Sequence, residues 1–136
     1  MIPPHILTVR TAFEAAASQW PDRPFLNVLP ETAEVYGIEA GEITYGLAQE
    51  KVAGLTDQLR AAGYARGQRV MLHLENRPEY FLWWLALNGL GLSVVPVTPG
   101  LRSAELEYMI GHSEPVLAIA IAPRAAELRD AASAAG

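Results

Sequence analysis

The sequence predicts an α/β protein with an open, mainly parallel sheet, helices on both faces of that sheet, and a short N-terminal hairpin. Three nearly continuous apolar runs of strand length occupy residues 70–74, 94–97 and 116–121. Such runs are typical of strands that are covered on both faces. Segments with the helical spacing of apolar residues separate them. Strands that alternate with helices of this length indicate a parallel sheet with right-handed crossovers.

The first 45 residues predict a helix that is followed by a loose hairpin. Thr8 is a suitable N-cap for a helix over residues 8–19, in which apolar residues recur at helical spacing. Residues 25–29 and 42–45 are candidate strands of the hairpin. The acidic segment 30–41 between them shows no clear period, so we expect a loop there.

The next helix, over residues 45–62, has the clearest pattern in the chain. Thr44 is a suitable N-cap, and Gly63 suits the left-handed conformation that often ends a helix. One apolar seam follows alternating steps of four and three residues, as expected for a helix that buries one side. The seam comprises Ala48, Val52, Leu55, Leu59 and Ala62.

The chain is organised around residues 80–101, which contain no charged side chain. We expect a buried helix over residues 80–87, with Pro78 in its first turn and Asn76 as its cap. An asparagine and two glycines then interrupt the helix, and residues 94–97 follow as a buried strand.

A membrane span is the alternative interpretation of this uncharged stretch, because its length is about that needed to cross a bilayer. Two glycines and Ser93 lie in its middle, and Pro96 and Pro99 lie toward its end. The flanking segments also supply the other parts of a soluble α/β unit. These features favour the soluble interpretation.

The rest of the chain predicts a helix, a strand and a helix after a Pro–Gly turn. Ser103 is a suitable cap for a helix over residues 104–110 that ends at Gly111. The third apolar strand covers residues 116–121, and Pro123 opens a final alanine-rich helix. We therefore divide residues 1–136 into a helix and hairpin over 1–45 and an alternating helix/strand unit over 46–136.

Composition narrows the class of protein. The 136 residues suit one domain or a piece of a larger one, and the net charge of −5 without a basic cluster gives little support to nucleic-acid binding. The absence of cysteine excludes disulfides and thiolate catalysis. The N-terminus does not resemble a signal peptide, so we expect a cytoplasmic protein without a transmembrane segment. Charged residues are only 18% of the chain, which suggests that a partner covers part of the surface.

Side-chain chemistry alone assembles no catalytic or metal site in this sequence. The three histidines, His5, His73 and His112, are not spaced as metal ligands are. His73 lies within an apolar strand, where we expect a hydrogen-bonded core or edge histidine rather than a base. Trp83 and Trp84 are expected to pack in the core rather than to line a ligand pocket.

Four linked segments resemble adenylate-forming (AMP-binding) enzymes, the superfamily of acyl-CoA synthetases, luciferases and peptide-synthetase adenylation domains. Each segment is mostly core and turn residues, but their joint order and spacing cover nearly the whole chain. The departures are Leu47 where the family usually has Glu, Thr98 where it has Asn, and Pro115 where it has a small residue. The four segments read TAFEAAASQWPDRPFL, GEITYGLAQEKVAGLTDQLRAAGYARGQRVMLHLENRPEYF, LALNGLGLSVVPVTPGLRSAELEYMI and SEPVLAIA.

The resemblance implies that the chain is the N-terminal portion of an enzyme of the acyl-CoA synthetase type, within a larger doubly wound domain. Such an enzyme uses ATP and Mg²⁺ to convert a carboxylic acid to acyl-AMP, then transfers the acyl group to the thiol of CoA. The family's phosphate loop and catalytic lysine lie beyond residue 136, so no residue here is expected to be catalytic or to bind metal. Arg102 is the one candidate, as a contact for a CoA phosphate.

The remainder of the same polypeptide is therefore the expected partner, and the 136-residue chain alone is expected to be inactive and structural. A natural truncation, a stand-alone α/β interaction module, and an adenylation domain or luciferase-like member of the superfamily are the alternatives. The sequence does not determine the acyl substrate, the acceptor thiol or the oligomeric state.

Overall fold

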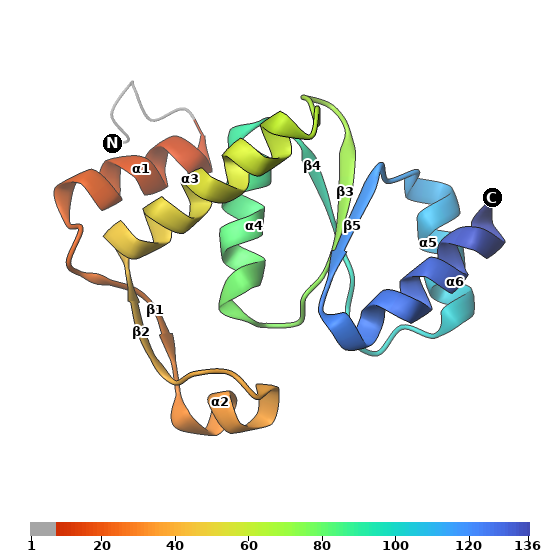
Figure 1. The fold of residues 1–136 in the computed structure, drawn as a ribbon, viewed down its shortest axis with the longest axis horizontal. Helices are drawn as coiled ribbons and strands as arrows, with labels where there is room; N and C mark the ends of the chain where they lie inside the picture. Colours follow the sequence, from red (N-terminus) through yellow and green to blue (C-terminus); the bar gives the residue numbers. More distant parts are fainter. Residues whose placement is uncertain (1–7) are drawn as a thin grey trace.

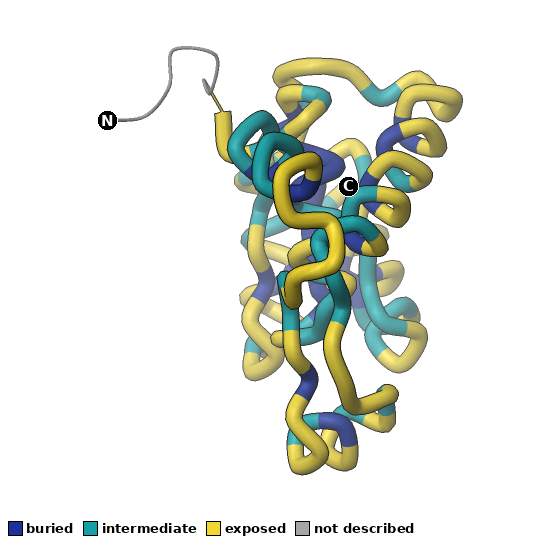
Figure 2. Tube along the Cα trace, turned by 90° about the vertical axis from the view of Figure 1, so that its left-hand side faces the viewer, coloured by how far each residue is buried: buried dark blue, intermediate teal, exposed yellow. Residues whose placement is uncertain are grey.

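The computed structural model describes residues 8–136, so His5 lies outside the described residues. Two layers of helices enclose a small parallel sheet, and a two-stranded ribbon projects from one side (Figure 1). Exposed residues dominate the turns and the outer helix surfaces, whereas the buried positions lie inside (Figure 2). The predicted fold class is confirmed.

The central sheet contains three parallel strands in the order β4-β3-β5. These strands are β3 (Arg69–His73), β4 (Ser93–Pro96) and β5 (Leu117–Ala120). Residue Val70 of β3 lies opposite Val94 of β4 and Leu117 of β5. The chain thus crosses from one edge of the sheet to the other between β4 and β5, and both of these outer strands leave one edge unpaired within the three-stranded sheet.

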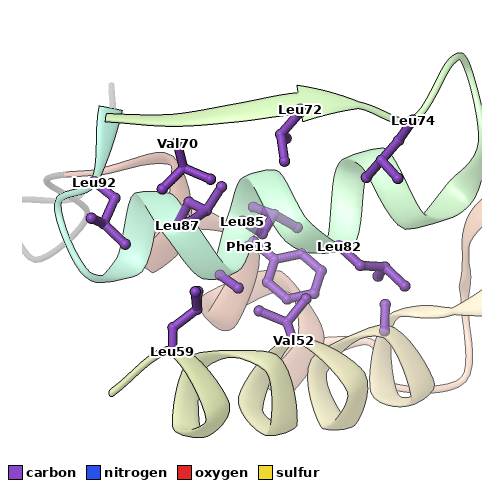
Figure 3. Close-up of a cluster of buried hydrophobic side chains, with 12 residues drawn as sticks. Phe13, Val52, Leu59, Val70, Leu72, Leu74, Leu82, Leu85, Leu87 and Leu92 are labelled. Atoms are coloured by element: carbon purple, nitrogen blue, oxygen red, sulfur yellow. The ribbon is translucent and has the colours of Figure 1, made fainter. Parts of the chain in front are cut away.

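One face of the sheet packs against three helices, α1 (Val9–Gln19), α3 (Tyr45–Ala61) and α4 (Pro78–Gly89). Figure 3 shows apolar side chains of these helices in one cluster with Val70 and Leu72 of the central strand, with α4 next to the strand. The opposite face packs against α5 (Ser103–Ser113) and α6 (Ala125–Ala135), which follows the short 3₁₀ helix η1 (Ala122–Arg124). Met71 of β3, Leu106 of α5 and Leu128 of α6 form this second cluster.

The predicted N-terminal helix and hairpin are present. Thr8 caps α1, and its hydroxyl accepts a hydrogen bond from the backbone N–H of Thr11 at 3.1 Å. Strands β1 (Pro24–Val28) and β2 (Gly41–Thr44) pair in antiparallel fashion, with a register shift between Pro24 and Leu26. Thr44 caps α3, as expected, by accepting a hydrogen bond from the Leu47 N–H at 3.2 Å.

The loop predicted over residues 30–41 is wrong, because α2 (Pro30–Tyr36) forms there. Pro30 stands in its first turn, where a missing N–H removes no helical bond, and Glu31 lies near the positive end of the helix. Gly37 ends it in the left-handed conformation at φ 61°. The helix has only seven residues, too few to display a hydrophobic period.

The buried side of α3 differs from the predicted seam at its C-terminal half. Thr56 is buried, whereas Ala62 is exposed and Leu55 is half-buried. Arg10 of α1 explains the buried threonine, because its Nη1 donates to the Thr56 Oγ at 3.1 Å and to the Leu85 carbonyl at 3.3 Å. One arginine therefore joins α1, α3 and α4.

Three predicted helix ends are also wrong. Arg77 rather than Asn76 is the N-cap of α4, without a side-chain hydrogen bond, and Ser103 is the first residue of α5 rather than its cap. Gly111 lies inside α5, which continues to Ser113 and ends at Glu114 in the left-handed region, with φ 44°. Glycine is not necessary where the closing N–H bond forms, as it does here from Glu114 to the Ile110 carbonyl at 2.9 Å.

The predicted hydrogen bonding of His73 is wrong. Its side chain lies in the interior with 1% relative exposure, and neither ring nitrogen has a hydrogen-bond partner among the described residues. Burial lowers the pKa of His73 from its ordinary value of 6.5, Arg124 lowers it further, and Glu127 and Glu75 act in the opposite direction. The native structure therefore favours the neutral imidazole.

The uncharged stretch over residues 80–101 is divided between helix α4 and strand β4. No helix within residues 8–136 combines the length and the apolar character that a membrane crossing requires. The helical part of the stretch belongs to α4, which has 12 residues.

We expect Glu114→Gly to raise the free energy of unfolding by about 1 kcal/mol, because a left-handed residue other than glycine carries a steric cost of that order. The substitution also removes the ion pair with Arg69, but both side chains are largely exposed and such pairs contribute little. Urea unfolding followed by circular dichroism measures the change. Glu114→Ala is the matched control, since it removes the pair and keeps the cost; equal stability of the two variants would contradict the prediction.

We expect His73→Leu to stabilise the chain by on the order of 1 kcal/mol at pH 7.5, because it replaces two unpaired buried nitrogens with apolar volume. Below pH 6.5 the unfolded chain binds a proton at His73 more readily than the native chain, so the native chain becomes less stable as the pH is lowered. The advantage of the variant therefore grows between pH 7.5 and pH 5. Urea unfolding at several pH values measures it, and a pH-independent difference is the contrary result.

Candidate functional site

The carboxyl ends of the three parallel strands meet at one edge of the sheet, which is where open α/β sheets usually bind ligands. The segment after β3 leads to α4 on one face, whereas the segment after β5 leads to η1 and α6 on the other (Figure 1). Strands β3 and β5 are neighbours, and the segments that follow them turn toward opposite faces of the sheet. This geometry selects the carboxyl edge as the candidate site.

The segment between β3 and α4 places a tight group of side chains at this edge. Glu75 has a left-handed backbone with φ 57°, which is unusual for a residue other than glycine. Its carboxylate accepts a hydrogen bond from Arg77 Nε at 3.3 Å, and both side chains are less than 20% exposed. The Arg77 guanidinium also lies 5.1 Å from the ring centre of Tyr36 in α2. Backbone strain at such a position is typical of functional segments.

Arg102 lies in the turn between β4 and α5, at the same edge. It is the N-cap of α5, and its backbone N–H donates to Glu105 Oε2 at 2.8 Å. The residue is exposed, and its guanidinium forms no ion pair with a carboxylate of the described residues. Its charge is therefore available to a ligand beside the positive end of a helix.

Arg124 is a third arginine at this edge, after Arg77 and Arg102, and the sequence did not reveal it. Its Nη2 donates to the Pro99 carbonyl at 3.3 Å, and its Nη1 lies 3.3 Å from Glu127 Oε2. Arg124 thus joins the turn that carries Arg102 to the start of α6. The signal available in the sequence was an arginine directly after a predicted strand and Pro123. Its contact with Pro99 could not be predicted, because the two residues are 25 positions apart.

The structure brings Arg102 and His73 to one edge of the sheet and separates the other candidates. Trp83 and Trp84 both pack against the core cluster of α3 and α4, as expected. Trp84 also lines a cavity of about 320 Å³ with Phe13 and Phe25. Within residues 8–136, no group of three His, Cys, Asp or Glu side chains is arranged to hold a metal ion.

Comparison of the sequence with known proteins identifies longer relatives. The chain is 28% identical over 129 residues to the sulfoacetate–CoA ligase of Cupriavidus necator, which covers 95% of the chain and 24% of the ligase. It is 32% identical over 114 residues to a salicylyl-CoA synthase / salicylate adenylyltransferase of a Streptomyces species, covering 79% and 20%. The chain thus spans about a quarter or less of the length of these curated relatives.

Solved structures give the same fold. VinN superposes with a TM-score of 0.80 at 22% identity, over 91% of this chain and 31% of that one. The inhibitor-bound N-terminal domain of FACL13 from Mycobacterium tuberculosis superposes with a TM-score of 0.76 at 24% identity, over 90% and 29%. The sequence model of one family, described as AMP-binding enzyme, matches residues 13–135, and the chain therefore belongs to the AMP-binding enzyme family.

Proposed function

We propose that the chain is the N-terminal portion of an ATP-dependent acyl-CoA synthetase. The observation that carries the proposal is the family match over residues 13–135, together with relatives that are named CoA ligases. The chain covers only 24% of the sulfoacetate–CoA ligase, so the complete activity would belong to a longer polypeptide. Cytoplasmic location is part of the same proposal.

The whole enzyme would carry out two half-reactions. A carboxylate oxygen would attack the α-phosphorus of ATP and release pyrophosphate, and Mg²⁺, where bound, would offset the phosphate charge. The thiol of CoA then attacks the acyl carbon, and AMP leaves. The relatives are named for different acids, including sulfoacetate and salicylate, so the family match supports the reaction class rather than one acid.

The contribution of residues 1–136 would be structural. Residues 46–136 would supply the parallel strands of the doubly wound domain, and residues 1–45 the helix and hairpin that pack beside them. The remainder of the polypeptide would be the principal partner. The unpaired edges of β4 and β5 support this role, because natural sheets rarely leave such edges open.

Arg102 would contact a phosphate of CoA. Three observations support the assignment: the side chain is exposed, it has no carboxylate partner among the described residues, and it lies at the carboxyl edge of the sheet. A guanidinium binds phosphate by charge-assisted hydrogen bonds, which are stronger than neutral ones.

An adenylation domain of the same superfamily is the second candidate. The printed name of the Streptomyces relative includes an adenylyltransferase activity beside CoA ligation, which favours this candidate over unrelated functions. Both candidates form an acyl-adenylate and differ in the thiol that accepts the acyl group. Assay of the longest available gene product with free CoA and with a carrier-protein thiol distinguishes them.

We expect the purified 136-residue chain to show no acid-dependent exchange of pyrophosphate into ATP, because the proposal places the nucleotide site outside it. Exchange of radiolabelled pyrophosphate measures this, with a full-length relative such as the sulfoacetate–CoA ligase and its own acid as the positive control. Turnover by the purified chain would contradict the assignment of residues 1–136 as scaffold.

We expect the chain to bind CoA weakly, and Arg102→Ala to raise the CoA dissociation constant about ten-fold, the effect of losing roughly 1.4 kcal/mol of a charge-assisted contact. Isothermal calorimetry at pH 7.5 measures both constants. Arg60→Ala is the matched control, because Arg60 is an exposed arginine on α3, and its side chain pairs with Asp57. Equal affinities for CoA in both variants, or no binding by the wild type, would remove Arg102 from the proposal.

A further inference from the structure

Arg124 holds together two segments that the sheet brings to the same edge. Its backbone N–H donates to the Ile121 carbonyl at 2.9 Å, which fixes the residue at the end of η1. Its side chain reaches the Pro99 carbonyl at 3.3 Å and Glu127 at 3.3 Å. The bond to Pro99 thus ties the β4–α5 turn to η1.

His73 lies directly beside this contact. Its backbone carbonyl accepts a hydrogen bond from the Ile121 N–H at 3.3 Å, three residues before Arg124. Side chains alternate along a strand, so His73 faces the same side as Met71, which packs against α5 and α6. The charged groups that act on the ring are Arg124 of η1, Glu127 of α6 and Glu75 of the segment after β3.

We infer that Arg124 is a positioning residue for the turn that carries Arg102, and that a proton on His73 weakens this positioning. The inference rests on the proposed function, because it concerns the turn assigned there to CoA. Two features of the structure support it. Both ring nitrogens of His73 are buried without a partner among the described residues, and η1, which follows the strand paired with His73, holds a guanidinium that donates to Pro99.

A proton on the buried ring would have a direct structural consequence. The imidazolium would have two N–H donors and no acceptor among the described residues, at a position where water does not screen its charge. Repulsion between this charge and Arg124 would favour displacement of the guanidinium from Pro99. The turn over residues 98–102 would then keep its internal bond from the Leu101 N–H to the Thr98 carbonyl at 3.4 Å and the bonds of Arg102 to the first turn of α5, but would lose this bond to η1.

The test uses the free chain, because phosphate monoesters also titrate near pH 6 and would confuse a binding measurement. Two-dimensional amide NMR spectra of the 136-residue chain are recorded from pH 8 to pH 5. We expect the amide signals of Gly100, Leu101 and Arg102 to shift in one transition with a midpoint below 6.5. The ring protons of His73 should follow the same transition.

Three variants make the test specific. His73→Asn should abolish the transition, and Arg124→Met should give, already at pH 7.5, turn signals displaced in the direction that the wild type shows at pH 5. His112→Asn is the matched control, since His112 is an exposed histidine on α5 and its loss should leave the transition intact. Persistence of the transition in His73→Asn overturns the inference.

Titration of the wild-type His73 ring without any change at residues 100–102 also overturns the inference. This result comes from the wild type and does not depend on whether the variants fold. CoA calorimetry at pH 7.5 separates the two proposals. A turn transition without CoA binding removes the CoA assignment of Arg102 and leaves the positioning by Arg124 in place. CoA binding without a turn transition removes the coupling between His73, Arg124 and the turn, and leaves the CoA assignment of Arg102 in place.

Discussion

The burial of strand β3 is the constraint on which the rest of the structure depends. Val70 and Leu72 supply one hydrophobic cluster, Met71 supplies the other, and none of the three retains exposed area. Complete burial of such a side chain is worth roughly 1.5–3 kcal/mol. The strand also pairs with β4 through residues 69–72 and with β5 through residues 70–73. Both helical layers and both outer strands are therefore positioned relative to one short segment.

The position of β3 also creates the candidate site. Because β4 and β5 both run parallel to β3, the segments that follow all three strands lie at the same end of the sheet. Arg124 and Pro99 are 25 residues apart in sequence and 3.3 Å apart in the structure. The contact joins a turn on one edge of the sheet to a helix that begins at the other. A turn held in this way has fewer conformations available before a ligand arrives, which lowers the entropic cost of binding.

The sequence predicted the parts of the fold that leave a periodic or apolar pattern. The positions of the three parallel strands and the hairpin pairing follow from such patterns, and Arg102 was found because its turn matches a known segment. The expected burial holds for β3 alone, because β4 and β5 are outer strands whose residues are half-buried or exposed. Helix α2 and the end of α5 were missed, since seven residues show no period and Glu114 carries no left-handed signature. The bonds from Arg10 to Thr56 and from Arg124 to Pro99 join segments that are 25 or more residues apart in sequence. The lack of a partner for the His73 ring likewise depends on the elements packed around it. A local sequence pattern cannot predict such contacts, because they depend on the order of the strands in the sheet.

The projecting hairpin has a consequence for how the molecule opens. Helix α2 buries only Ala33, while Leu29 and Val35 on the same arm are 54% and 79% exposed. Its link to the body includes the stacking of Arg77 over Tyr36. Strand β3, by contrast, contributes to both hydrophobic clusters, so its amide protons should exchange only when both clusters separate. The arm is therefore an independent unit of local unfolding, and a protease added to the native protein should cleave first within residues 29–41 and leave the two-layered body intact.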